Sequence, residues 1–319
     1  MLHTKEAPCC ANITVEVWVQ ILGLQRLTFG VDDVEIAHNF LRDWNLKCIS
    51  STDKHSLFVT QEGAEVEICV SGAQELSGAV HADCSLREIV WAVADAASLS
   101  AIEASLGRIC DVVRRGDVLR AYDPTGFSVA FTLSRLANLA PATPSVNVPG
   151  RPVRINQPVD FNERPAVRHL GHVAIFVDDL DLAASFYIDG LGFRASDIYP
   201  GRGIFLRAAG SHDHHNIFLL KRSGPAGFHH MSFEVADFQE VITAGRNMRK
   251  SGWRTQVGPG RHTLGSNYFW YFHTPMGGAC EYYSDMDYLD DDWKVRSWTY
   301  SPDVVAAWST QMIEEHLTT

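Results

Sequence analysis

The stretch AGFHHMSFE at residues 226–234 gives the clearest indication of how this chain folds. After the histidine pair, apolar and polar residues alternate, which is the pattern of a strand with one face in a core. Met231 and Phe233 lie on one face, and His230 and Ser232 lie on the other. His230 is therefore expected to point away from the core, toward a place where an imidazole can bind something.

Two further apolar strands carry a potential metal ligand. The segment GHVAIFVDD has His172 at its second position, and the segment ACEYY contains Glu281. Two histidines and one carboxylate, each on its own strand, are the ligands of the facial triad that binds non-haem Fe(II). His172, His230 and Glu281 are thus the candidate metal ligands, with His229 as a less favoured alternative to its neighbour.

The chain contains an internal repeat. The segment GVDDVEIAHNFLRDWNL at 30–46 resembles FVDDLDLAASFYIDGLGF at 176–193. In the same way, VADAASLSAIEASLG at 93–107 resembles VADFQEVITAGRNMRKSG at 235–252. Both pairs have nearly the same separation along the chain, so the second half of the chain repeats the first.

Each half contains two similar units, and the expected fold class is therefore α+β, with two domains that each pair two βαβββ modules. Each helix begins at aspartates that can cap free N–H groups, and short alternating runs separated by turns follow as strands. A segment with five prolines indicates an extended linker. The expected parts are an N-terminal arm at 1–20, a domain without a metal site at 21–136, a linker at 137–164, a catalytic domain at 165–290 and a tail at 291–319.

Composition limits the classes of function. A hydrophobic content of 46% with 20% charged residues is typical of globular proteins. The net charge of -11 argues against nucleic acid as a partner. No run approaches the roughly 20 apolar residues that span a bilayer, and no apolar signal segment is recognisable. Because the seven cysteines also lack CxxC spacing, we expect reduced thiols and a cytoplasmic location.

The first half of the chain provides an internal comparison. By the repeat, the positions of the three candidate ligands are occupied there by Arg26, Glu88 and Ala130, so no triad exists in the first half. If the histidines were required by the fold alone, the first half should have retained them. We therefore expect the first domain to be a scaffold and the second to carry the chemistry.

With this arrangement, the chain resembles the type I extradiol ring-cleaving dioxygenases of the vicinal oxygen chelate (glyoxalase/bleomycin resistance) superfamily. The segment GRHTLGSNYFWYFHTPMGGACEYY looks like that family's pattern of G-x-H, an aromatic strand, P-x-G and a ligand Glu followed by Tyr. The resemblance is strongest from 169 to 285. It implies Fe(II), or less commonly Mn(II), a catechol-type substrate with O₂, and a homo-oligomer.

The resemblance also implies roles for residues around the metal. His215 matches the family's acid–base histidine, with His214 beside it as an alternative. His262 and Tyr271 match the pair that contacts the substrate next to the metal.

Four residues are candidates for the wall of the substrate pocket. Ala174 is small where some carboxylate-binding family members have a polar residue, and Phe269 lies in an aromatic run, so both favour an apolar catechol. His273 follows Tyr271 by two positions and could share its strand face. Arg296 resembles the basic residues that bind a substrate carboxylate in some members, although a salt-bridged surface tail is the favoured explanation.

The expected activity is extradiol cleavage of a catechol-type diol in aromatic compound degradation. A histidine with a pKa near neutrality can take and return the protons that this reaction moves. One alternative is a metal-dependent lyase or isomerase of the glyoxalase type, which commonly has four protein ligands. Another is a non-enzymatic binding protein on the same fold, which usually lacks the ligands.

Overall fold

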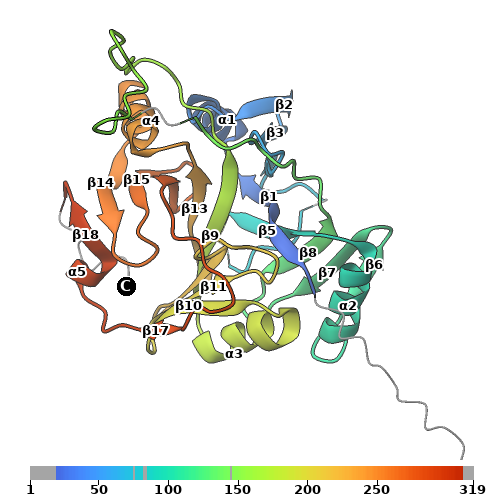
Figure 1. Ribbon diagram of the computed structural model, residues 1–319. Coiled ribbons are helices and arrows are strands. Elements are labelled where there is room, and N and C mark those ends of the chain that lie inside the picture. The colour runs from blue at the N-terminus through green and yellow to red at the C-terminus, as the bar shows by residue number, and fades with distance from the viewer. Residues whose placement is uncertain (1–18, 75, 82–84, 144–145, 312–319) are drawn as a thin grey trace, which may run out of the picture.

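The computed structural model describes residues 19–74, 76–81, 85–143 and 146–311 (Figure 1). Almost all of the predicted N-terminal arm and the last eight residues of the tail, 312–319, lie outside the described residues. None of the described helices is long and apolar enough to cross a membrane.

In the described part of the first half, eight strands form one sheet. The strands are β1 (Ile21–Val31), β2 (Lys47–Ser51), β3 (His55–Val59), β4 (Glu65–Val70), β5 (Leu86–Val93), β6 (Val113–Arg115), β7 (Val118–Tyr122) and β8 (Ser128–Leu133), and the helices are α1 (Val34–Asp43) and α2 (Ala96–Leu106). The order in the sheet is β2-β3-β4-β1-β5-β8-β7-β6. Two four-stranded modules therefore meet where β1 pairs with β5.

In the described part of the second half, ten strands form another sheet. The strands are β9 (His169–Val177), β10 (Arg194–Tyr199), β11 (Gly203–Arg207), β12 (Ile217–Lys221), β13 (Gly227–Glu234), β14 (Thr255–His262), β15 (Tyr268–His273), β16 (Ala279–Ser284), β17 (Arg296–Ser297) and β18 (Ala306–Ser309). The helices are α3 (Leu180–Ser185), continued by the π-helical turn η1 (Phe186–Gly190), α4 (Phe238–Lys250) and α5 (Pro302–Val305).

The second sheet repeats the topology of the first. Its order is β17-β10-β11-β12-β9-β13-β16-β15-β14-β18. Without the edge strands β17 and β18, this order is that of the first sheet, module by module. The predicted α+β class with two domains of paired βαβββ modules is confirmed. Strands of the first sheet end at Leu133 and those of the second begin at His169, on either side of the predicted linker.

The helices begin where the aspartates predict. Asp33, Asp95, Asp179 and Asp237 are the N-caps of α1 to α4, and each carboxylate accepts a hydrogen bond from a backbone N–H three residues later. The distances are between 2.7 and 3.0 Å. Such caps stabilise a helix by about 1 kcal/mol each, so the repeated aspartates define the start of each helix in the repeat.

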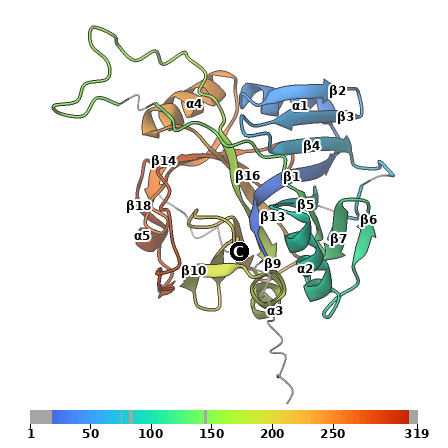
Figure 2. The ribbon, with the colours of Figure 1, turned by 45° about the vertical axis from the view of Figure 1, so that its right-hand side comes forward.

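The two halves share one hydrophobic core. Figures 1 and 2 show α1 of the first half beside α4 of the second. Trp44, which follows α1, stacks on Tyr282 of β16 with ring centroids 3.6 Å apart, and the Tyr282 hydroxyl donates to the Trp44 carbonyl at 2.8 Å. The indole N–H of Trp253 also donates to Asp43 at 3.0 Å. Because β16 also carries Glu281, this packing supports a strand of the candidate site.

Trp44→Ala should lower the free energy of unfolding by about 3–5 kcal/mol, because it removes a fully buried indole from the interface between the halves. Urea denaturation followed by circular dichroism measures this change. Tyr122→Ala is the control, since Tyr122 is 58% exposed and should change stability by about 0.5 kcal/mol or less. Equal losses for the two variants would contradict a shared core.

Candidate metal centre

Three neighbouring strands at the centre of the second sheet carry the candidate ligands. β13 lies between β9 and β16, and Ser232 of β13 pairs with His172 on one side and with Glu281 on the other. Paired residues, and residues two apart on one strand, lie on the same face of a sheet. His172, His230 and Glu281 therefore project from one face, although they are distant in sequence.

The ligand atoms of these three residues converge. His172 Nε2 lies 3.1 Å from His230 Nε2 and 3.2 Å from Glu281 Oε2, and His230 Nε2 lies 3.8 Å from the same oxygen. Adjacent ligands of a six-coordinate ion with bonds of about 2.1 Å lie about 3 Å apart, so the three atoms fit one face of such an ion. His229 contacts His230 from the side, Nδ1 to Nδ1 at 2.5 Å, and is not in this group of ligand atoms.

The charge of Glu281 needs compensation because the side chain is fully buried. Ser232 donates its hydroxyl to Oε2, and Asn267 donates its amide to Oε1 at 3.2 Å. A cation beside two imidazoles and a carboxylate would supply the remaining compensation. The donor set and its geometry therefore fit a divalent metal ion, and these residues could hold one.

His215 lies next to the ligands and borders a cavity. Its ring centroid is 4.1 Å from that of His172, while His214 lies behind it, fully buried. Burial lowers the pKa of His215 well below its usual value, and the neighbouring imidazoles of His172, His214 and His230 lower it further. At neutral pH the ring is thus neutral, with a lone pair on one of its nitrogens.

His262 and Tyr271 form a hydrogen-bonded pair on the same cavity. His262 Nδ1 lies 2.8 Å from the Val305 carbonyl oxygen, which only accepts, so Nδ1 carries a proton. Neutral His262 then accepts from the Tyr271 hydroxyl at Nε2, over 3.0 Å. Burial raises the pKa of Tyr271 well above its usual value, and Glu281 raises it further. The phenol therefore stays protonated and remains a hydrogen-bond donor.

The cavity beside the three ligands has mainly apolar walls. Besides five residues described above (His172, His215, His230, His262 and Tyr271), its lining consists of Tyr199, Arg202, Phe205, Phe218, Leu220, His229, Gln256, Val257, Leu264, Asn267, Phe269, Tyr300 and Val305. Of the predicted pocket residues, Phe269 is in this lining, whereas Ala174, His273 and Arg296 are not. Ala174 packs beneath Phe218 and Leu220, and Arg296 pairs with Asp197.

Part of the cavity wall consists of residues that the sequence did not predict. Tyr199 and Arg202 come from the hairpin between β10 and β11, and Tyr300 and Val305 come from the C-terminal segment. The guanidinium of Arg202 lies over the Tyr300 ring, 4.8 Å from its centroid. The aromatic residues of the tail were the available signal, but a tail of mixed composition does not reveal which strand it will contact.

The first sheet has the same framework without the ligands. Glu88 pairs with Thr28, which follows Arg26 by two positions. In the second sheet, His230 pairs with the residue two positions after His172. The register therefore confirms that Arg26 and Glu88 occupy the positions of the two histidines.

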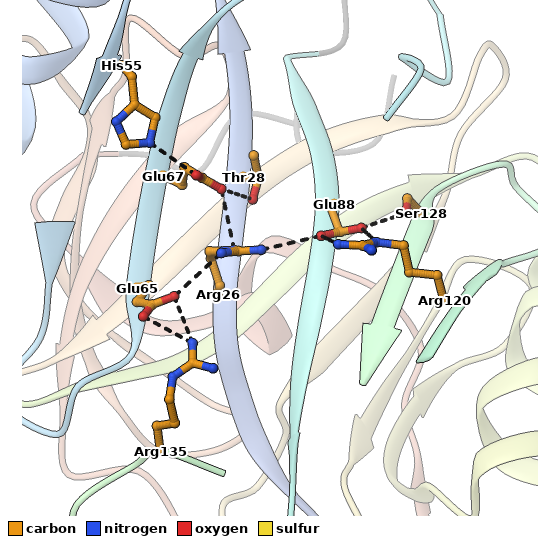
Figure 3. A network of polar contacts seen from close by, with 9 residues as sticks. All are labelled: Arg26, Thr28, His55, Glu65, Glu67, Glu88, Arg120, Ser128 and Arg135. Carbon is orange, nitrogen blue, oxygen red and sulfur yellow. Dashed lines mark hydrogen bonds and ion pairs between the residues drawn. The ribbon is translucent and has the colours of Figure 1, made fainter. Parts of the chain in front are cut away.

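Ion pairs fill that place in the first sheet (Figure 3). The Arg26 guanidinium lies 3.7 Å from Glu65, 3.4 Å from Glu67 and 3.7 Å from Glu88. Arg120 also pairs with Glu88 at 2.7 Å. Here the positive charge between the carboxylates is supplied by arginine, which explains why the first half needs no metal.

His55, Glu67 and Cys69 form a second group of potential ligands beside this network. Glu67 already accepts a hydrogen bond from Thr28 at 3.0 Å and contacts His55 at 3.1 Å. Because the Arg26 guanidinium lies next to the same carboxylate, a cation would be repelled there. We assign no metal to this group.

Comparisons with known proteins agree with this geometry. Residues 169–282 match the family described as the Glyoxalase/Bleomycin resistance protein/Dioxygenase superfamily. Metapyrocatechase 2 of Cupriavidus necator is 42% identical over 127 residues, which are 40% of this chain and 39% of that protein. The chain spans about two fifths of the length of the first curated relatives that it matches. The similarity to this superfamily therefore lies in the second half of the chain.

Solved structures extend the similarity of fold to nearly the whole chain. The Mn(II)-bound glyoxalase from Novosphingobium aromaticivorans has a TM-score of 0.74 at 20% identity, covering 94% of each chain. BphC, described as a halotolerant catechol dioxygenase, has a TM-score of 0.73 at 18% identity, covering 94% of this chain and 97% of that one. Both halves therefore share the fold of these proteins.

His230→Ala should abolish stable binding of Fe(II), because it removes one of three converging ligand atoms. Metal analysis after anaerobic reconstitution and gel filtration measures the iron that remains. His229→Ala is the matched control and should retain iron at close to the wild-type ratio. Full iron in the His230 variant, with loss in the His229 variant, would assign the ligand to the neighbouring residue instead.

Arg26→Met should leave catalytic activity within about twofold, because the network of the first sheet takes no part in the chemistry. It should lower the free energy of unfolding by about 1–3 kcal/mol, since it leaves partly buried carboxylates without their partner. Steady-state kinetics and urea denaturation measure the two effects. A large loss of kcat in a folded, iron-loaded variant would show that the first domain contributes to catalysis.

Proposed function

We propose that this protein is an extradiol dioxygenase, which cleaves a catechol-type ring beside its two hydroxyls with O₂. The observation that carries the proposal is the buried, converging group of His172, His230 and Glu281, whose two histidines line an aromatic cavity. A set of two histidines and one carboxylate is typical of Fe(II) oxygenases and leaves metal positions open for substrate and oxygen. The relative named metapyrocatechase and the solved structure described as a catechol dioxygenase support the proposal.

Fe(II) is the proposed metal, and when bound it would supply Lewis acidity and electron transfer between an electron-rich diol and O₂. Mn(II) accepts similar nitrogen and oxygen ligands, and a solved structure of the same fold is Mn(II)-bound. Metal analysis of the purified protein distinguishes the two ions.

The protein's own groups move protons and orient the substrate. His215, held neutral by burial, takes the proton of one catechol hydroxyl and returns it later in the reaction. The Tyr271 hydroxyl donates its hydrogen to His262, so its oxygen can accept a hydrogen bond from a substrate hydroxyl. Both groups border the same cavity as His172 and His230.

The cavity favours an aromatic substrate with an apolar substituent. Phe205 and Phe218 stack on each other with centroids 3.8 Å apart and form part of the wall, together with Phe269 and Leu264. Apolar walls gain from burying an aromatic ring and exclude water from the reaction. The charged Arg202 is exposed at the wall, so it can contact a polar group at the far end of a larger substrate.

The proposal is tested by anaerobic reconstitution with Fe(II), followed by 2,3-dihydroxybiphenyl, catechol or 3-methylcatechol under air. We expect one O₂ consumed per diol and a yellow ring-opened product, measured with an oxygen electrode and by absorbance. His215→Ala should keep its iron and lose about 10²-fold or more in kcat. His38→Ala, which changes a histidine of the first domain, is the control and should retain activity.

The same preparation tests the alternative glyoxalase-type activity. Such an enzyme would consume the adduct of methylglyoxal with a thiol and would take up no O₂ with any diol. That result would overturn the proposal. The three converging ligands, with arginine in the corresponding place of the first half, favour the dioxygenase.

A further inference from the structure

A series of buried polar groups begins at Nδ1 of His215. His214 Nδ1 is 3.0 Å from His215 Nδ1, and His214 Nε2 is 2.8 Å from Oδ2 of Asp197 on β10. His214 and Asp197 are both fully buried. A carboxylate is therefore connected to the acid–base histidine through a second imidazole.

The C-terminal segment holds Asp197 in place. Arg296 donates to both carboxylate oxygens, from Nε at 2.8 Å and from Nη2 at 2.6 Å, and the indole N–H of Trp298 donates to Oδ1 at 3.0 Å. Burial raises the pKa of Asp197, but the hydrogen bonds from His214, Arg296 and Trp298 outweigh burial and hold the pKa below its usual value. Asp197 is therefore ionised and can only accept hydrogen bonds.

This acceptor determines the direction of the hydrogen bonds in the series. His214 donates its Nε2–H to Asp197, and in the neutral ring Nδ1 then has a lone pair. That lone pair can only accept, so His215 donates its Nδ1–H to it. The Nε2 of His215, at the other side of its ring, is left without a proton.

We propose that Asp197 and His214 are positioning residues that hold His215 in the tautomer whose Nε2 accepts the proton of a catechol hydroxyl. When His215 takes that proton, Nε2 gains a hydrogen and the Nδ1–H bond to His214 is kept, so no other proton has to move. The catalytic consequence rests on the proposed function. The tautomers themselves are a property of the folded chain.

Arg296 and Trp298 also have a function in this series, because they fix the carboxylate of Asp197. They lie in or next to β17, which pairs with β10 at Asp197 and Ile198. The two donors prevent the carboxylate from rotating away from His214. The C-terminal segment thus supports the acid–base histidine in addition to forming part of the cavity wall.

Nitrogen NMR of the metal-free full chain, labelled with ¹⁵N-histidine, measures the tautomers directly. We expect a proton on Nδ1 of His215 and on Nε2 of His214. In Asp197→Asn, the amide oxygen should face Arg296 and Trp298 and the amide N–H should face His214, which reverses both tautomers. A proton on Nε2 of wild-type His215, or unchanged tautomers in the variant, would overturn the inference.

Kinetics of the Fe(II)-loaded enzyme measure the consequence for the reaction. Asp197→Asn and His214→Leu should retain iron and lose between about 10²- and 10⁴-fold in kcat. His214→Gln should recover most of this loss, because its amide N–H can donate to Asp197 while its amide oxygen accepts from His215. If His214 had only a structural role, the His214→Gln and His214→Leu variants would have similar kcat values. Equal kcat for the two His214 variants would contradict the inference.

Asp123→Asn is the matched control, because Asp123 is also a buried carboxylate, hydrogen-bonded to Tyr187 at 3.2 Å in the interface between the halves. It should lower stability without changing the tautomers or kcat of the folded enzyme. If Asp197→Asn does not fold, the two His214 variants decide the question. A wild-type enzyme without O₂ uptake would refute the proposed function, and the NMR result would still decide the tautomers.

Discussion

The register of β13 against its two neighbours is the constraint on which the site depends. Ser232 pairs with both His172 and Glu281, and this places three ligands on one face. A slip of one residue would turn each side chain of β13 to the other face, moving His230 into the core and Met231 into the site. The apolar face of β13 prevents this slip, because Met231 and Phe233 are fully buried.

The two halves show two ways of neutralising carboxylates on the same framework. In the first half, the Arg26 guanidinium lies among three glutamates, and its positive charge compensates their negative charge. In the second half, the neutral groups of Ser232 and Asn267 donate to Glu281, and the compensating charge would come from an exchangeable ion. A side chain in that place closes the site, whereas an ion with open positions can bind a substrate.

The C-terminal segment links stability to the chemistry. Arg296 and Trp298 hydrogen-bond Asp197, and Val305 accepts from His262, so this segment contacts groups behind both His215 and Tyr271. The contacts of Arg296 and Trp298 act on His215 through Asp197 and His214, whereas Val305 orients His262 directly. Precise placement of acid–base groups depends on such support from outside the site.

The sequence by itself determined the modules, the helix starts, the repeat and the set of chemical groups around the metal, because alternation, capping and repetition are local or periodic patterns. Only the tertiary structure decided the cavity wall, the partner of Arg296 and the series from Asp197 to His215. Arg296 and Asp197 are 99 positions apart, and no periodicity relates them. Their contact arises from the pairing of β17 with β10, which depends on how a short edge strand packs after the sheet has formed.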